Sequence, residues 1–157
     1  MSFSVRLAFP EDAFAISSVI IGALRETNSK DYSPEIISLV EQSFSPAGIG
    51  SLISQRRMYV AASSREILGT ASLDGDVVRS VFVAPDHQGK GIGKRLMRVI
   101  EDYARDFGIV SLKVPSSVTA ESFYTRLGFH VLREQFHGEE RTIIMELILQ
   151  SEDRTGK

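Results

Sequence analysis

The feature that most constrains this sequence is residues 77–107, where a strand pattern, a glycine-studded loop and a helix pattern follow one another. The apolar run VVRSVFV predicts a strand, and the polar loop after it carries Gly89, Gly91 and Gly93. From Ile92 onward, apolar residues recur at helical spacing. Unpaired N–H groups at a helix N-terminus attract anions, and glycine lets the backbone approach a ligand closely. The segment therefore predicts a site for a phosphorylated ligand.

The spacing of these glycines argues against two common nucleotide-binding loops. A P-loop, G-x-x-x-x-G-K-[ST], needs a hydroxyl residue after its Gly-Lys pair, whereas glycine follows Gly89-Lys90 and arginine follows Gly93-Lys94. A dinucleotide fingerprint, G-x-G-x-x-G, needs a different last spacing and a place directly after the first strand. Three predicted strands precede the strand that leads into this loop. A nucleoside triphosphate or a dinucleotide is therefore not the expected ligand.

Hydrophobic periodicity and turn residues predict an α+β chain around one mixed sheet. Helices are expected at residues 12–26 and 92–107, and after Ser33, Ser45 and Ser117, each of which is an expected N-cap. Because a helix joins them, the strands at 77–83 and 109–114 are expected to be parallel neighbours. Pro115 is expected to break the second of these strands. Strands are expected at residues 3–9, 58–63, 66–75, 77–83, 109–114, 129–134 and 140–149.

Composition narrows the class of function. The formal net charge of −2 gives no electrostatic reason to expect a nucleic-acid partner. The sequence has no cysteine, and its three histidines lack helical i, i+4 spacing, so no metal site is expected. No apolar run has the length of a membrane span, and the N-terminus has no apolar signal core. We therefore expect one cytoplasmic domain over residues 1–150, with no membrane partner, and a polar tail over 151–157.

Two motifs, in this order, resemble the GCN5-related N-acetyltransferase (GNAT) family. Residues 88–93, QGKGIG, match the pyrophosphate-loop signature [RQ]-x-x-G-x-[GA]. Residues 120–129, AESFYTRLGF, match the downstream pattern A-x-x-[FY]-Y-x-x-x-G-[FY]. Close resemblance covers about 77–130, and the predicted order of elements is also the family order. It implies a single-domain GNAT-like fold, with a mostly antiparallel sheet of about seven strands, a bulge in the strand at 77–83, and a splayed parallel pair.

The resemblance also implies an acyl-CoA substrate, usually acetyl-CoA, and transfer of its acyl group to a primary amine on a small molecule or peptide. A strand backbone N–H would stabilise the oxyanion. Tyr124 would be the general acid for the leaving thiolate. Ser117 departs from the usual asparagine but keeps one hydrogen bond. The implied cofactor-binding residues are Val81, Phe82, Val83, Gln88, Gly89, Lys90, Gly91, Ile92, Gly93, Lys94, Ser117, Ala120 and Phe123.

Several points stay open at this stage. The strand at 77–83 offers no carboxylate, so the general base is not identified; the candidates are Asp74, Asp76, Glu26, Glu139 and His137. The acceptor would be set by the segments at 25–56 and 134–140. A homodimer is compatible with the family. The alternatives are a non-catalytic acyl-CoA-binding or sensing module, and an interaction domain that binds no CoA. His87 is expected to be an exposed loop residue.

Overall fold

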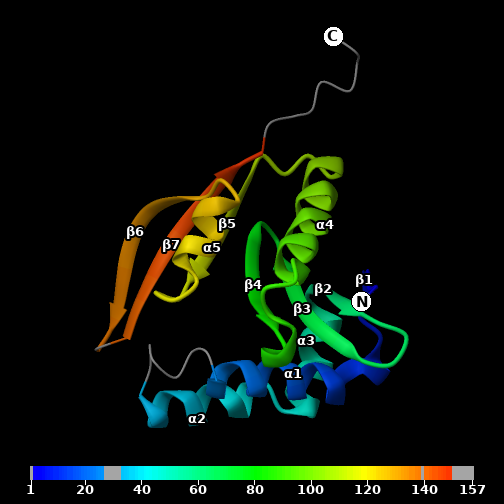
Figure 1. Cartoon of the computed structure of the whole chain (residues 1–157). Helices are drawn as coiled ribbons and strands as arrows, with labels where there is room; N and C mark the ends of the chain where they lie inside the picture. The colour runs from blue at the N-terminus through cyan, green and yellow to red at the C-terminus, as the bar shows by residue number, and fades with distance from the viewer. Residues whose placement is uncertain (1, 27–32, 139, 150–157) are drawn as a thin grey trace.

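The computed structural model describes residues 2–26, 33–138 and 140–149, which build a seven-stranded sheet in the order β1-β2-β3-β4-β5-β7-β6 (Figure 1). Neighbouring strands are antiparallel except β4 and β5, which are parallel. The predicted α+β class and mixed sheet are confirmed. The strands are β1 (Ser4–Leu7), β2 (Arg57–Ala62), β3 (Ile67–Asp74), β4 (Val77–Val83), β5 (Ser111–Ser116), β6 (His130–His137) and β7 (Glu140–Ile148).

Helices cover the two faces of the sheet, and each face has its own hydrophobic core. The side chains of β2 alternate between these two cores. Met58 and Val60 pack with apolar residues of α1 and α3, whereas Tyr59 and Ala61 pack with the α4 side. This division follows from strand geometry, because successive side chains point to opposite faces. The helices are α1 (Ala13–Glu26), α2 (Pro34–Ser43), α3 (Pro46–Gln55), α4 (Ile92–Asp106) and α5 (Glu121–Arg126), with short 3₁₀ turns η1 (Pro10–Asp12) and η2 (Pro85–His87).

Two of the three expected N-caps are confirmed. Ser33 Oγ accepts the Ile36 N–H at 3.3 Å, and Ser45 Oγ accepts the Gly48 N–H at 3.2 Å. The third expectation was wrong, because α5 begins at Glu121 rather than directly after Ser117. The Ser117 hydroxyl instead accepts the N–H of Ala120 at 3.2 Å, closing a separate turn before the helix.

The expected strand break at Pro115 is also wrong, since β5 runs through this residue and pairs it with Ile144 of β7. Lys113 donates its N–H toward β4, to Asp76 O at 3.0 Å. Main-chain groups alternate along a strand, so the nitrogen of Pro115 also faces β4. The described pairing of β4 with β5 has ended by then. Proline therefore removes no ladder hydrogen bond here.

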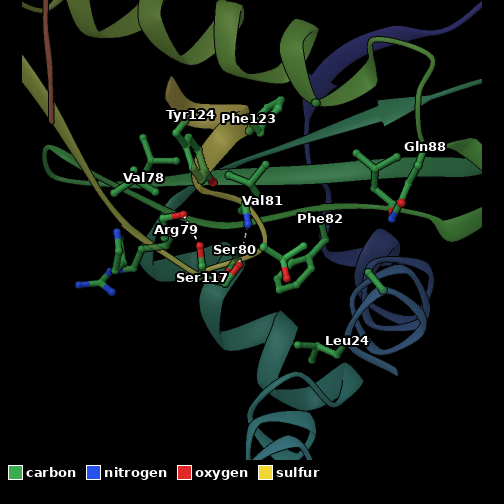
Figure 2. Close-up of a pocket in the computed structure, with 18 of the residues that line it drawn as sticks. Leu24, Val78, Arg79, Ser80, Val81, Phe82, Gln88, Ser117, Phe123 and Tyr124 are labelled. Carbon is green, nitrogen blue, oxygen red and sulfur yellow. Dashed lines mark hydrogen bonds between the residues drawn. The ribbon is translucent and has the colours of Figure 1, made fainter. Parts of the chain in front are cut away.

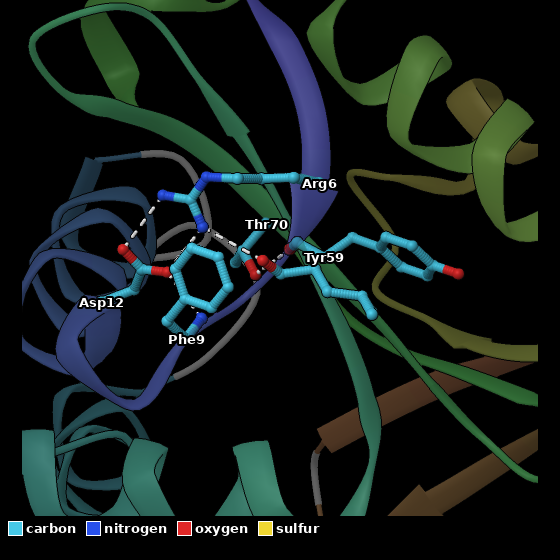
Figure 3. A network of polar contacts seen from close by, with 6 residues as sticks. Arg6, Phe9, Asp12, Tyr59 and Thr70 are labelled. Carbon is cyan, nitrogen blue, oxygen red and sulfur yellow. Dashed lines mark hydrogen bonds and ion pairs between the residues drawn. The ribbon is translucent and has the colours of Figure 1, made fainter.

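A polar cluster ties β1 to the start of the first helical segment (Figure 3). Arg6 donates from Nη1 to Asp12 Oδ2 at 2.8 Å and from Nη2 to Oδ1 at 3.2 Å. The N–H of Phe9 donates to Asp12 Oδ2 at 2.7 Å. The Arg6 hydrogen bonds, followed by the Phe9 N–H, outweigh burial and lower the pKa of Asp12. Asp12 therefore stays ionised at neutral pH and holds both partners.

The helical stripe predicted in α4 is confirmed at Ile92, Leu96 and Ile100, which are buried, but not at Phe107. Phe107 is 69% exposed because it lies one residue beyond the last helical turn. No described helix is long and apolar enough to cross a bilayer alone; α2 and α3 pass such a test only as a pair bent by 61°. The single domain over residues 1–150 stays a prediction, and the tail over 151–157 lies outside the described residues.

Candidate active site

The parallel strands β4 and β5 separate soon after they meet. Their described pairing is Val77 opposite Lys113. Further along β4, the ladder to β3 shifts register, and Ser80 adopts a left-handed conformation with φ of 59°. Such a conformation costs a non-glycine residue about 1–2 kcal/mol, and it is typical of a bulge that redirects a strand. The bulge and the splayed pair that the family resemblance implied are both confirmed.

The separation leaves main-chain groups of β4 without a neighbouring strand. The N–H of Ala84 donates to a β3 carbonyl at 2.8 Å, and Phe82 is paired with Thr70 of β3. By alternation, the N–H of Val83 and the carbonyls of Val81 and Val83 face the opened side. Gln88 donates its side-chain amide to the Val83 carbonyl at 3.3 Å. An extended chain entering the gap would therefore meet free donors and acceptors.

A cavity of about 1070 Å³ occupies this gap, a volume near the upper end of ordinary ligand pockets, roughly 300–1,000 Å³. Its lining comes from both faces of the sheet. Figure 2 shows Phe123 and Tyr124 on one side of β4 and Leu24 and Phe82 on the other. The cavity therefore passes through the sheet between the α4–α5 face and the α1–α2 face.

The structure brings nearly all the predicted site residues to this cavity. Lys90 is the exception; its Nζ lies 3.4 Å from His87 Nδ1, and it is exposed. The individual roles of the predicted site residues stay predictions. The lining includes Tyr124 and the predicted cofactor-binding residues Val81, Phe82, Val83, Gln88, Gly89, Gly91, Ile92, Gly93, Lys94, Ser117, Ala120 and Phe123.

The glycine loop ends where α4 begins, with its backbone amides presented to the cavity. Gly89 and Gly91 have φ of 78° and 81°, which glycine adopts without strain. Gly91 is the N-cap, and the first α-helical bond runs from the Arg95 N–H to its carbonyl at 3.0 Å. The N–H groups of Ile92, Gly93 and Lys94 therefore have no helical partner. Unpaired amides at a helix N-terminus, together with the helix dipole, favour an anion, so this end of α4 is compatible with the predicted phosphate site.

The histidine of this loop differs from expectation. His87 is not exposed: its side chain retains 13% of its accessible surface, and its Nε2 lies 2.9 Å from Glu66 Oε2. It also lines the cavity. The reason is tertiary, since η2 carries His87 against the turn that precedes β3.

Tyr124 is 5% exposed and lies between two aromatic rings, with ring centroids 5.1 Å from Phe123 and 5.4 Å from Phe129. No described residue is recorded as a hydrogen-bond partner of its hydroxyl. Burial raises the pKa of Tyr124 well above the ordinary tyrosine value, because the phenolate would lose its hydration. The phenol is therefore protonated at any physiological pH and available as a donor.

The general-base candidates that lie within the described residues are not part of this cavity. Asp74 lies 3.5 Å from the Arg79 guanidinium, and Asp76 lies 3.2 Å from Lys113 Nζ. Neither Glu26 nor His137 lines the cavity, and Glu139 is outside the described residues.

Sequence reasoning missed several charged residues of the lining, and two of them, Glu140 and Arg56, matter for the chemistry. Glu140, at the start of β7, is the one carboxylate among the described lining residues. The sequence predicted only that it lies at the start of a strand and in the segment 134–140. Arg56, the C-cap of α3, also lines the cavity, and no motif marks it. Across residues 2–26, 33–138 and 140–149, no cluster of three or more His, Cys, Asp or Glu side chains is placed to hold a metal ion.

A mixed sheet with separated central strands, an anion loop at a helix N-terminus and a buried tyrosine together define the acetyltransferase class that the motifs resemble. The family model described as "Acetyltransferase (GNAT) domain" matches residues 28–147. The chain belongs to the GNAT family, and it is an N-acetyltransferase.

Similar proteins agree with this assignment. The uncharacterized N-acetyltransferase YafP of Escherichia coli is 24% identical over 134 residues, which cover 85% of each chain. A GCN5-related N-acetyltransferase structure from Rhodopseudomonas palustris superposes with a TM-score of 0.87 at 23% identity, covering 95% of this chain and 97% of that one. The PaiA N-acetyltransferase of Thermoplasma acidophilum, solved with coenzyme A, gives a TM-score of 0.81 at 23% identity, covering 94% and 99%.

Proposed function

We propose that this protein transfers the acetyl group of acetyl-CoA to a primary amine by direct attack of the amine on the thioester. The observation that carries the proposal is the cavity that passes through the sheet where β4 and β5 separate. One ligand can enter from the glycine loop on the α4 side and a second from the α1–α2 side, so that the two meet beside the bulge. The coenzyme A complex of the Thermoplasma protein supports the identity of the first ligand.

Acetyl-CoA would be held by main-chain groups. Its pyrophosphate would accept hydrogen bonds from the amides at the start of α4. Its pantetheine arm would lie along β4 and pair with the open N–H of Val83 and the open carbonyl of Val81, as an added strand does. Phe123, on the opposite wall, would pack against the arm. This places the thioester near the bulge at Ser80.

The chemistry needs few side chains. The neutral amine attacks the thioester carbon, and a strand N–H stabilises the resulting oxyanion. Collapse of the tetrahedral intermediate breaks the C–S bond, and the thiolate takes the proton of Tyr124. Burial makes that phenol a weaker acid, but burial of the thiolate released beside it would also raise the basicity of that thiolate. Glu140, as a carboxylate in the cavity wall, would receive the amine proton, directly or through water.

The test has two stages. Isothermal titration with acetyl-CoA measures binding, and thiol release then measures transfer to a panel of primary amines. We expect binding, and thiol release that depends on the amine. Binding without release for any amine would favour the sensing-module alternative, and absence of binding would refute a CoA function altogether.

A further inference from the structure

The part of the cavity on the α1–α2 face has an apolar wall. Leu24 of α1 and Val40 of α2 contribute to it, together with Phe44 and Phe82, whose rings meet edge to face at 6.0 Å. Ile36 and Ile37 complete this wall. A site of this kind takes an aliphatic or aromatic group, because the gain comes from removing apolar surface from water.

One cation of this wall, Arg56, has no ion-pair partner among the described residues. Arg56 Nη1 donates to Ser80 Oγ at 3.2 Å and reaches Ser72 Oγ at 3.5 Å, and neither partner carries charge. No carboxylate of the described residues forms an ion pair with it. Its neighbour Arg79 differs, since its Nε lies 3.5 Å from Asp74 Oδ2. Burial first, and then the positive charge of Arg79, lower the pKa of Arg56, and the negative charge of Asp74 opposes this shift only in part.

The position of Arg56 separates it from the expected phosphate site. It binds Ser80, the bulge residue, whereas the glycine loop is reached only after the rest of β4 and the turn η2. An anion on Arg56 would therefore lie beside the expected thioester position, and it would belong to the acceptor rather than to the cofactor.

We propose that the acceptor is an α-amino acid with an apolar side chain, whose carboxylate is bound by Arg56 and whose side chain lies against the α1–α2 wall. This inference rests on the proposed function and specifies its substrate class. A guanidinium can bind a carboxylate through two parallel hydrogen bonds, and Arg56 has donors to spare after its contacts with the two serines. A carboxylate on the carbon beside the amine brings that amine close to the bulge, where the thioester is expected.

The experiment compares substrates that differ in one group. Leucine is matched with isopentylamine, which lacks the carboxylate, and with leucinamide, in which the carboxylate is replaced by a neutral amide. We expect leucine to be acetylated with a kcat/KM at least about tenfold above either analogue. In Arg56→Met the KM for leucine should rise by about 10- to 100-fold while kcat and the constants for leucinamide change little. Arg56→Lys should recover part of the loss, since it keeps the charge.

Arg65→Met is the matched control, because Arg65 is exposed in the turn before β3 and outside the cavity lining. The proposal is overturned if leucine is used no better than isopentylamine, or if Arg56→Met affects leucine and leucinamide equally. In either case the acetyltransferase function stands. If no amine is acetylated, the proposed function fails instead, and titration of the CoA-bound protein with N-acetyl-leucine tests the carboxylate site alone. We expect binding that Arg56→Met weakens at least about tenfold, and no binding would overturn the proposal.

Discussion

Replacing Tyr124 with phenylalanine removes one hydroxyl and keeps the ring, so it separates the chemical role of this residue from its packing role. The ring contacts with Phe123 and Phe129 remain. The hydroxyl has no recorded partner among the described residues, so its loss breaks no internal hydrogen bond there. We therefore expect the free energy of unfolding to change by less than about 1 kcal/mol.

The effect on turnover should be much larger. If Tyr124 donates the proton to the departing thiolate, its loss should lower kcat by about 10²- to 10³-fold, which corresponds to about 2.7–4 kcal/mol in the activation barrier. The dissociation constant for acetyl-CoA should stay within about twofold, because the main-chain groups of β4 and the glycine loop are untouched. An interaction made only during the reaction affects kcat in this way without affecting binding.

The assay is continuous detection of released thiol at saturating acetyl-CoA, alongside calorimetry and urea unfolding of the same preparations. Tyr103→Phe is the matched control. Tyr103 lies on α4, its ring centroid is 4.5 Å from that of Phe107, and it does not line the cavity. Unchanged kcat in Tyr124→Phe would refute the general-acid role. So would a loss of turnover fully matched by weaker acetyl-CoA binding, since that would make Tyr124 a binding residue.

Three further predictions address the remaining charges. Glu140→Gln should lower kcat/KM by about 10- to 100-fold in the thiol-release assay. The control is Glu134→Gln, on the same hairpin but outside the cavity lining, which should leave kcat/KM unchanged. Equal effects of the two substitutions would remove Glu140 from the mechanism. Because burial raises the pKa of Tyr124, kcat/KM should rise with pH as the amine is deprotonated and show no tyrosine-dependent fall up to about pH 10; a fall that is absent from Tyr124→Phe would contradict this. Asp12→Asn should lower the free energy of unfolding by about 1 kcal/mol at neutral pH, as measured by urea unfolding. The pKa of Asp12 is lowered in the folded state. The stabilisation that its carboxylate provides is therefore present above the ordinary carboxyl pKa and is lost as pH falls through the pKa of Asp12 in the folded protein. A stability difference between the unsubstituted protein and Asp12→Asn that persists in acid would contradict this.

The elements that sequence predicted well are those whose signal is local. Ser33 and Ser45 each precede proline, and both proved to be caps of the helices that follow. The glycine loop was found because a left-handed backbone at Gly89 and Gly91 demands glycine, and because the helix pattern after it is strongly periodic. The downstream motif then placed Tyr124 opposite the loop, in the same cavity.

The misses are residues whose environment is set by segments distant in sequence. Pro115 is compatible with a strand only because the partner on one side has separated from it. Nothing near Glu140 distinguishes a cavity carboxylate from a solvated turn. Arg56 follows a helix in a way typical of a surface cation, and its significance comes from Ser80, far along the chain. Such contacts depend on the register of the sheet, which local periodicity does not specify.

Ser80 shows why the centre of this site is the hardest part to predict. A serine carries no strong preference for a positive φ, so its residue type does not locate the bulge, which the family resemblance implied only for the strand at 77–83 as a whole. The conformation persists because β3 holds β4 on both sides of it. The Ser80 hydroxyl also accepts a hydrogen bond from Arg56. The same residue lies where β4 turns away from β5, at the proposed entry of the pantetheine arm, and it accepts a hydrogen bond from Arg56, which has no ion-pair partner among the described residues. If both proposals hold, cofactor entry and acceptor selection meet at this one strained residue, because it lies between the two parts of the cavity.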